Sequence, residues 1–230
     1  MAAAPARISG NARKPRGQGH ERVEEILAIA KAMFLAEGFD AVTTRRLAER
    51  VGLSQAGLYV YFKSKEEILD ALCQRAYETT LSAFRRIEEE VSDDLERFRR
   101  TLRVFVEIGL DHPEEYQIIY MRPRALLYGL GEGPGRGARE SRGVQVVRWQ
   151  HDLVRRLIRT GVFRTMNAKV ACQVALFAPH GLIAKLIAWP DFPWAQRDAL
   201  IDATIECLVA GFLAPGCVSS SRKPLKDGHE

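Results

Sequence analysis

Residues 43–65 read TTRRLAERVGLSQAGLYVYFKSK, and this pattern predicts two short helices joined by a tight turn. A threonine at the start can cap the first helix through its hydroxyl. Gly52 suits the turn because glycine tolerates the positive φ that ends a helix. Ser54 is placed to cap the second helix, expected at residues 55–61. This spacing is typical of a helix-turn-helix, whose second helix lies in the major groove of DNA.

The polar side chains of this stretch suit contact with nucleic acid. Hydroxyl, amide and cationic groups bond phosphates and base edges. Such groups occur at Arg45, Arg46, Gln55, Tyr59, Tyr61, Lys63 and Lys65. Glu49 is a rare acid among them. The stretch therefore predicts a DNA-reading surface.

Residues 43–69, TTRRLAERVGLSQAGLYVYFKSKEEIL, resemble the DNA-binding signature of the TetR family of bacterial transcriptional regulators (TetR/AcrR type). The shared elements are T-x-R-x-[LI]-A, V-G-[LV]-S, L-Y-x-[YH]-F and K-[SN]-K-E-x-L. They occur in one uninterrupted block with the family's internal distances. The resemblance covers approximately residues 18–70, which is under a third of the chain.

The resemblance implies eight DNA-contacting positions. These are Thr44, Arg45, Gln55, Ala56, Gly57, Tyr59, Tyr61 and Lys65. The threonine and arginine would open the first helix of the motif, and the tyrosines and the lysine match positions that usually bond phosphates. Gln55 could bond an adenine or a phosphate, and the small residues after it permit close approach to base edges. Family members often carry a bulkier residue where this chain has Gly57.

Two of these assignments have a competing interpretation. Each tyrosine could instead belong to the core, but Leu58 and Phe62 already supply the core-facing spacing. Lys65 could be a solvated lysine, yet it stands at the start of a helix, where a cation is electrostatically disfavoured. An unfavourably placed cation suggests a phosphate partner.

Composition narrows the class of protein. The chain has 230 residues, is 47% apolar and 27% charged, and carries a net charge of +5, which fits a polyanionic partner. Its cysteines, Cys73, Cys172, Cys207 and Cys217, show no metal-binding spacing, and the first three fall in apolar helical patterns that predict buried free thiols. We expect no cofactor and no metal.

The chain shows no signal for a membrane location. No run approaches the ~18 apolar residues of a membrane helix, and the N-terminus lacks an apolar signal core. We therefore expect a cytoplasmic protein without membrane contact.

Apolar residues recur at every third or fourth position along most of the chain, which predicts an all-α fold of about nine helices. We expect a disordered basic arm at 1–18, a TetR-type helix-turn-helix DNA-binding domain at 19–79, a larger helical effector-binding and dimerisation domain at 80–214 and a disordered tail at 215–230. The arm is either a solvated tail or an aid to DNA binding through phosphates or the minor groove. The glycine-rich segment 129–143 is expected to be a loop, because neither a preceding strand nor a Lys-Ser/Thr pair supports a nucleotide site.

Candidate residues for a small-molecule pocket and a dimer interface come from the second domain. The pocket candidates are Phe105, Tyr116, Tyr120, Trp149 and Phe177, with His180 as a polar anchor; plain core packing is the alternative for each. The last two helices, expected at 169–189 and 193–213, are rich in small residues that allow close packing, and by resemblance they would form an intersubunit four-helix bundle. The dimer candidates are Val174, Gly181, Leu200, Thr204 and Leu208.

These observations favour a sequence-specific DNA-binding transcriptional regulator, namely a homodimeric repressor on a palindromic operator that an apolar or aromatic small-molecule effector releases. The alternatives are an activator of the same fold or a basic protein that binds DNA without sequence preference. No catalytic constellation stands out, so we do not expect an enzyme.

Overall fold

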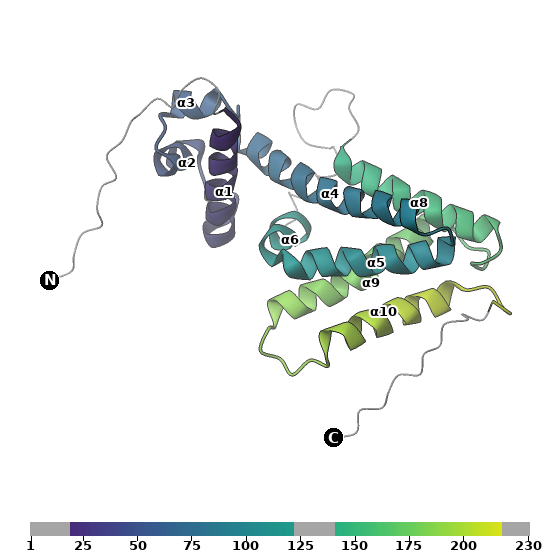
Figure 1. The fold of residues 1–230 in the computed structure, drawn as a ribbon. Coiled ribbons are helices and arrows are strands. Elements are labelled where there is room, and N and C mark those ends of the chain that lie inside the picture. The colour runs from purple at the N-terminus through teal and green to yellow at the C-terminus, as the bar shows by residue number, and fades with distance from the viewer. Residues whose placement is uncertain (1–18, 122–140, 218–230) are drawn as a thin grey trace. The chain divides into compact units, whose positions relative to one another are not determined.

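The computed structural model describes residues 19–121 and 141–217, and in these ranges the chain forms nine α-helices (Figure 1). The helices are α1 (Gly19–Glu37), α2 (Thr44–Val51), α3 (Gln55–Tyr59), α4 (Lys65–Glu90), α5 (Asp94–Asp111), α6 (Pro113–Tyr120), α8 (Arg142–Arg159), α9 (Ala168–Ala188) and α10 (Arg197–Phe212). The described residues contain no strand beyond one isolated bridge between Phe163 and Leu213. The prediction of an all-α fold is confirmed. The expected arm, the expected glycine-rich loop up to residue 140 and the tail from residue 218 lie outside the described residues.

The chain divides into two compact units. The first comprises Met1–Tyr77 with Glu114–Gly143, and the second comprises Glu78–Pro113 with Val144–Glu230. Helix α4 contributes its first half to one unit and its second half to the other.

The first three helices form the core of the first unit. Helix α1 buries one stripe of apolar residues, consisting of Ile26, Leu27, Ala30, Met33 and Phe34. Helix α2 packs on α1, and α3 packs on α2; Leu47 of α2 and Leu58 of α3 are both fully buried. Because α2 and α3 are too short to be stable alone, this packing holds the helix-turn-helix together.

Local signals set the ends of these helices. The Thr43 hydroxyl accepts from the Arg46 amide at 3.3 Å and caps α2, and Gly52 ends that helix with a φ of 75°. The Ser54 hydroxyl accepts from the Gly57 amide at 3.0 Å and caps α3. Helix α3 ends at Tyr59, two residues earlier than predicted, because the chain tightens into a turn there.

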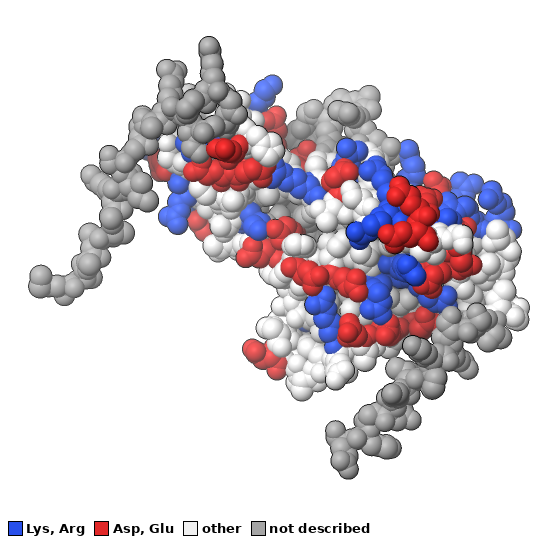
Figure 2. All heavy atoms as spheres, viewed as in Figure 1, with Lys and Arg blue, Asp and Glu red and all other residues white. Residues whose placement is uncertain are grey.

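The second unit has an aromatic centre. The rings of Phe98, Phe163 and Phe212 lie 5.2–6.3 Å apart, and they join α5, the segment after α8 and the end of α10. Helices α5, α9 and α10 pack on one another. Figure 2 shows acidic and basic side chains alternating over α5, while the surface over the connection between α9 and α10 carries little charge.

Two expectations about this unit were wrong. Cys207 was expected to be buried but is exposed on α10, on a helix face that the described residues leave uncovered. The second expectation was that no run of the chain approaches a membrane helix. Helix α9 contains an 18-residue window with a mean hydropathy of 1.6, which by length and composition is apolar enough to span a membrane. Only 28% of that window is buried, so the helix presents apolar surface outward. A core or interface helix of a soluble protein meets the same criterion, so the window alone is weak evidence for a membrane span.

Candidate nucleic-acid interface

Three of the predicted DNA-contacting residues form one hydrogen-bonded network on the surface of the first unit. The Gln55 side-chain amide donates to the Tyr59 hydroxyl at 3.1 Å and to the Thr44 hydroxyl at 3.4 Å. The two hydroxyls lie 3.5 Å apart. Thr44 opens α2, whereas Gln55 and Tyr59 belong to α3, so the network joins the two helices of the motif.

This network makes the Tyr59 hydroxyl a better hydrogen-bond donor. Hydrogen bonds from Thr44 and Gln55 lower the pKa of the Tyr59 phenol below its ordinary value. The side chain is 44% exposed, its oxygen accepts from Gln55, and its hydrogen is available to an outside acceptor when the Thr44 hydroxyl is the donor of the bond between the two hydroxyls. A polarised and exposed hydroxyl suits a phosphate acceptor.

The other predicted contacts lie on the same short segments. Arg45 pairs with Glu49 at 3.1 Å, but both side chains are more than 60% exposed, so the pair is weak and a phosphate can compete for the guanidinium. Tyr61 is 36% exposed in the turn after α3. Ala56 is exposed in the first turn of α3.

Gly57 has a structural role that the sequence did not reveal. A Cβ at this position would lie 3.2 Å from the Ser54 hydroxyl oxygen, which is tighter than most such contacts. The same oxygen accepts from the Gly57 amide. A glycine here therefore leaves the cap of α3 undisturbed, besides leaving space for an approaching base edge.

Lys65 is engaged by the protein itself. Its ammonium donates to the carbonyl oxygens of Phe39 at 2.8 Å, Val42 at 3.0 Å and Asp40 at 3.3 Å. It also lies 4.5 Å from the centre of the Phe39 ring. These carbonyls belong to the connection between α1 and α2, a partner that the sequence analysis did not anticipate.

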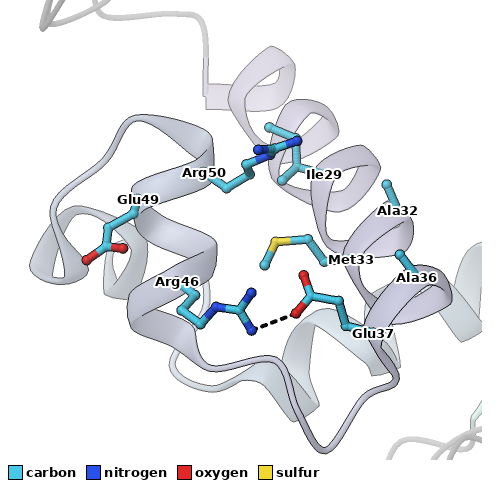
Figure 3. A pocket seen from close by; sticks show the side chains of 8 residues that line it. All are labelled: Ile29, Ala32, Met33, Ala36, Glu37, Arg46, Glu49 and Arg50. Atoms are coloured by element: carbon cyan, nitrogen blue, oxygen red, sulfur yellow. Dashed lines mark ion pairs between the residues drawn. The ribbon is translucent and has the colours of Figure 1, made fainter. Parts of the chain in front are cut away.

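A groove of about 630 Å³ lies between α1 and α2 (Figure 3). Its apolar side comes from α1, through Ile29, Ala32, Met33 and Ala36. Charged side chains border it, and Arg46 pairs there with Glu37 at 2.6 Å. None of the predicted ligand-binding residues lines this groove.

The predicted pocket residues fall into both units. In the first unit, Tyr116 and Tyr120 stack with ring centres 4.7 Å apart, and Tyr77 meets Tyr120 edge-on at 5.7 Å. Burial raises the pKa of each of these phenols, so they stay protonated. Tyr77 was not among the predicted residues, although its spacing along α4 was recognised as part of an apolar stripe.

The remaining four pocket candidates lie in the second unit. The Trp149 indole packs on Phe84 with ring centres 4.9 Å apart and donates to the Glu88 carboxylate at 2.9 Å. Phe105 is buried, and burial lowers the pKa of the half-buried His180. Phe177 is 67% exposed, so its ring faces away from the core of this unit.

The predicted dimer residues lie along a largely uncovered surface of α9 and α10. Val174 is 39% exposed, Gly181 is exposed, and Leu200, Thr204 and Leu208 are half-buried. Val170 and Phe177 extend the same apolar surface. Within the described ranges, no group of three or more His, Cys, Asp or Glu residues is placed to hold a metal ion.

The fold and the capped pair α2–α3 define the class of protein: an all-helical protein with an N-terminal helix-turn-helix. Residues 26–72 match the family model described as bacterial regulatory proteins, tetR family. This stretch of the chain, about a fifth of its length, is thus similar to the helix-turn-helix domain of that family.

Two curated relatives are each similar to part of the chain. The nucleoid occlusion factor SlmA of Vibrio vulnificus is 39% identical over 93 residues, which cover 40% of this chain and 47% of SlmA. The HTH-type transcriptional repressor KstR2 of Mycobacterium tuberculosis is 32% identical over 104 residues, which cover 45% of this chain and 52% of KstR2. The chain thus matches about half the length of these relatives.

Solved structures extend the likeness of fold over most of the chain. The structure of the ketosteroid transcriptional regulator KstR2 of M. tuberculosis superposes with a TM-score of 0.59 at 20% identity, covering 90% of this chain and 99% of KstR2. AibR in complex with isovaleryl coenzyme A and operator DNA gives a TM-score of 0.58 at 17% identity, covering 84% and 99%. At these identities the likeness establishes the fold alone.

Proposed function

We propose that this protein is a DNA-binding transcriptional regulator that reads its operator through the start of α2, through α3 and through the turn that follows α3. The observation that carries the proposal is the Thr44–Gln55–Tyr59 network, which gathers exposed polar groups from both helices of the motif. Seven of the eight predicted positions are then direct DNA contacts: Thr44, Arg45, Gln55, Ala56, Gly57, Tyr59 and Tyr61. Lys65 has its donors engaged by the protein and receives a different role below.

The regulator acts as a homodimer on a palindromic operator. A two-fold site requires two recognition helices about 34–36 Å apart, which one chain cannot supply. The uncovered apolar surface of α9 and α10 supplies a self-complementary interface, with Phe177 in it rather than in a pocket. Burial in such an interface also accounts for the apolar character of α9 without a membrane.

A small-molecule effector releases the repressor from DNA. Such an effector works only if it binds one conformation of the protein better than the other. The aromatic candidates are the buried Tyr116 and half-buried Tyr120 of the first unit and the buried Phe105 and half-buried Trp149 of the second, and their chemistry favours an apolar or aromatic ligand. The structure of AibR with isovaleryl coenzyme A and operator DNA is a precedent for a fold of this kind.

Fluorescence anisotropy with labelled DNA tests this function. The DNA is the region upstream of the protein's own gene, and a scrambled duplex of equal length is the control, each at two salt concentrations. We expect the upstream DNA to bind about a thousandfold more tightly or better. Equal affinity for several upstream and scrambled duplexes, with a salt slope set by phosphates alone, would instead establish a non-specific DNA-binding protein.

A further inference from the structure

All three N–H donors of the Lys65 ammonium are engaged in hydrogen bonds within the first unit. An ammonium group has three N–H donors, and three backbone carbonyls, those of Phe39, Asp40 and Val42, lie within 2.8–3.3 Å of it. The Phe39 ring covers the same charge at 4.5 Å. A phosphate could therefore be bound only by giving up at least one of these bonds.

The three carbonyls belong to the connection that precedes α2. Carbonyls in such a connection lie outside the helical hydrogen-bond ladder and need other partners. Val42 immediately precedes Thr43, whose hydroxyl caps α2, and the next two residues are the proposed DNA contacts Thr44 and Arg45. Lys65 thus holds the backbone one residue before the cap of a DNA-contacting helix.

The start of α4 is itself a firm base for this contact. The Ser64 hydroxyl accepts from the Glu67 amide at 3.2 Å, and the Glu67 carboxylate accepts from the Lys63 amide at 2.6 Å. Ile68 and Leu69 follow in the core, each at most 2% exposed. The first turn of α4 is therefore fixed at both its polar and its apolar side.

We propose that Lys65 is a positioning residue: it ties the start of α4 to the connection between α1 and α2, and so fixes the DNA-contacting first turn of α2, without contacting DNA itself. The same contact gives α4 a route by which a displacement of its first turn alters DNA affinity. This inference rests on the proposed DNA-binding function.

The test compares Lys65→Met with two controls, Lys63→Met at an exposed neighbouring lysine and Arg45→Met at a proposed phosphate contact. Each variant is titrated against the upstream DNA over a range of salt concentrations. We expect Lys65→Met to weaken binding by about tenfold or more while the slope of log affinity against log salt stays that of the wild type. Arg45→Met reduces that slope by about one, and any loss of affinity in Lys63→Met is accompanied by a reduced slope as well, because an exposed lysine acts on DNA through its charge.

Hydrogen exchange in the free protein gives a second readout. The amides of Arg46 and Leu47 bond to Thr43, so loss of the anchor exposes them. We expect their exchange to accelerate by about tenfold in Lys65→Met and to stay unchanged in Lys63→Met. If Lys65→Met does not fold, Lys65→Gln, which keeps two N–H donors without the charge, decides by the same two measurements.

A slope reduced by about one with unchanged exchange would make Lys65 a phosphate ligand and overturn the proposal. Unchanged affinity together with unchanged exchange would overturn it as well. If the wild type shows no preference for any upstream DNA, the proposed function fails, while the exchange of Arg46 and Leu47 still decides whether Lys65 anchors α2.

Discussion

In the proposed DNA interface, residues of the Thr44–Gln55–Tyr59 network have different roles, one in reading a base and another in binding a phosphate. A glutamine side chain carries two N–H donors and one carbonyl acceptor, and its donors are engaged by Tyr59 and Thr44. The carbonyl oxygen is then the free group of Gln55, which suits a base edge that donates, such as N6 of adenine or N4 of cytosine. Tyr59 offers a hydroxyl hydrogen, which suits a phosphate.

This division gives opposite results for two substitutions. Gln55→Ala should reduce the preference for one base pair of each half-site by about 1–3 kcal/mol, whereas Tyr59→Phe should weaken binding to all sequences alike. Anisotropy titrations with a set of singly substituted operators at constant salt measure both effects. A Gln55→Ala protein that keeps the wild-type base preference would remove this residue from base reading.

Asp94 ties the beginning of α5 to α8 in the second unit. Its carboxylate accepts from Arg156 at 3.1 Å and from Arg97 at 2.6 Å. Burial alone raises the pKa of Asp94, but the bonds from Arg156 and Arg97 outweigh burial and hold the pKa below its ordinary value. The charged form is therefore favoured by folding, and the resulting stability is present above the ordinary carboxyl pKa.

Asp94→Asn should lower the free energy of unfolding by about 1–3 kcal/mol at neutral pH. The difference from the wild type should shrink as the pH falls from about 4 through the lowered pKa of the folded protein. Urea unfolding between pH 7 and pH 3 measures it. Asp198→Asn is the matched control, because Asp198 is an exposed acid in the first turn of α10 and should cost only about 0.3–1 kcal/mol. Equal losses in the two variants would mean that the pairs with Arg156 and Arg97 contribute nothing.

Several residue roles could not have been read from the sequence. The position of Lys65 at a helix start led to the prediction of a phosphate partner, whereas the carbonyls that its ammonium contacts lie 23–26 residues away in the sequence and become neighbours only in the folded unit. Cys207 has the apolar neighbours of a buried thiol, yet it lies on the outer face of α10. The chemistry of a side chain can be read from the sequence, whereas the group that it contacts is determined by the tertiary structure.

The observed helix ends agree closely with those predicted from the sequence where the capping contacts are local. Thr43, Ser54 and Gly52 set the ends of α2 and α3 by contacts within a few residues, so the helix-turn-helix could be predicted in detail. Helix α10 begins at Arg197 instead of at residue 193, because residues 189–196 form a separate aromatic turn in which the Trp194 indole donates to the Trp189 carbonyl at 2.9 Å. Helix α9 continues through Pro179, as the expected range 169–189 implied, although proline in a helix interior usually kinks or breaks it.

Helix α9 carries the most exposed part of the proposed dimer interface. Val170, Val174 and Phe177 are 55%, 39% and 67% exposed, and their spacing of four and three residues places them on one face. A charge on this face is harmless to the single chain but costly in an apolar interface.

Phe177→Glu should therefore weaken dimerisation by about thirtyfold or more, the effect of losing a central aromatic anchor, while leaving the helical content of the chain intact. Sedimentation equilibrium measures the dimer constant, and circular dichroism checks the fold. Ala28→Glu, at an exposed position of α1, is the control and should dimerise like the wild type. A dimeric Phe177→Glu protein would place the interface elsewhere.

At the scale of the whole molecule, the proposed two-fold arrangement determines how the two DNA half-sites must be spaced. Two half-sites on one face of the duplex lie about 10–10.5 base pairs, or 34–36 Å, apart. An insertion of five base pairs turns one half-site to the opposite face of the DNA, so a dimer can hold only one of them. In the proposed dimer, DNA affinity then depends on whether the two helix-turn-helix domains are joined, which couples the proposed interface of α9 and α10 to DNA binding through α2 and α3 by thermodynamic linkage.

Combining the insertion with the interface variant tests this linkage directly. For the wild type, a five-base-pair insertion between the half-sites should lower affinity by at least a hundredfold. The reason is that the second helix-turn-helix domain of the dimer no longer binds the same duplex at a high effective concentration. For Phe177→Glu at concentrations where it is monomeric, the same insertion should change affinity by less than about twofold, since each helix-turn-helix domain already binds alone. Anisotropy titrations of both proteins on both duplexes complete the cycle. If the insertion lowers the DNA affinity of the monomeric variant as much as that of the wild type, the loss comes from the altered DNA sequence itself. The two helix-turn-helix domains then do not act through dimerisation.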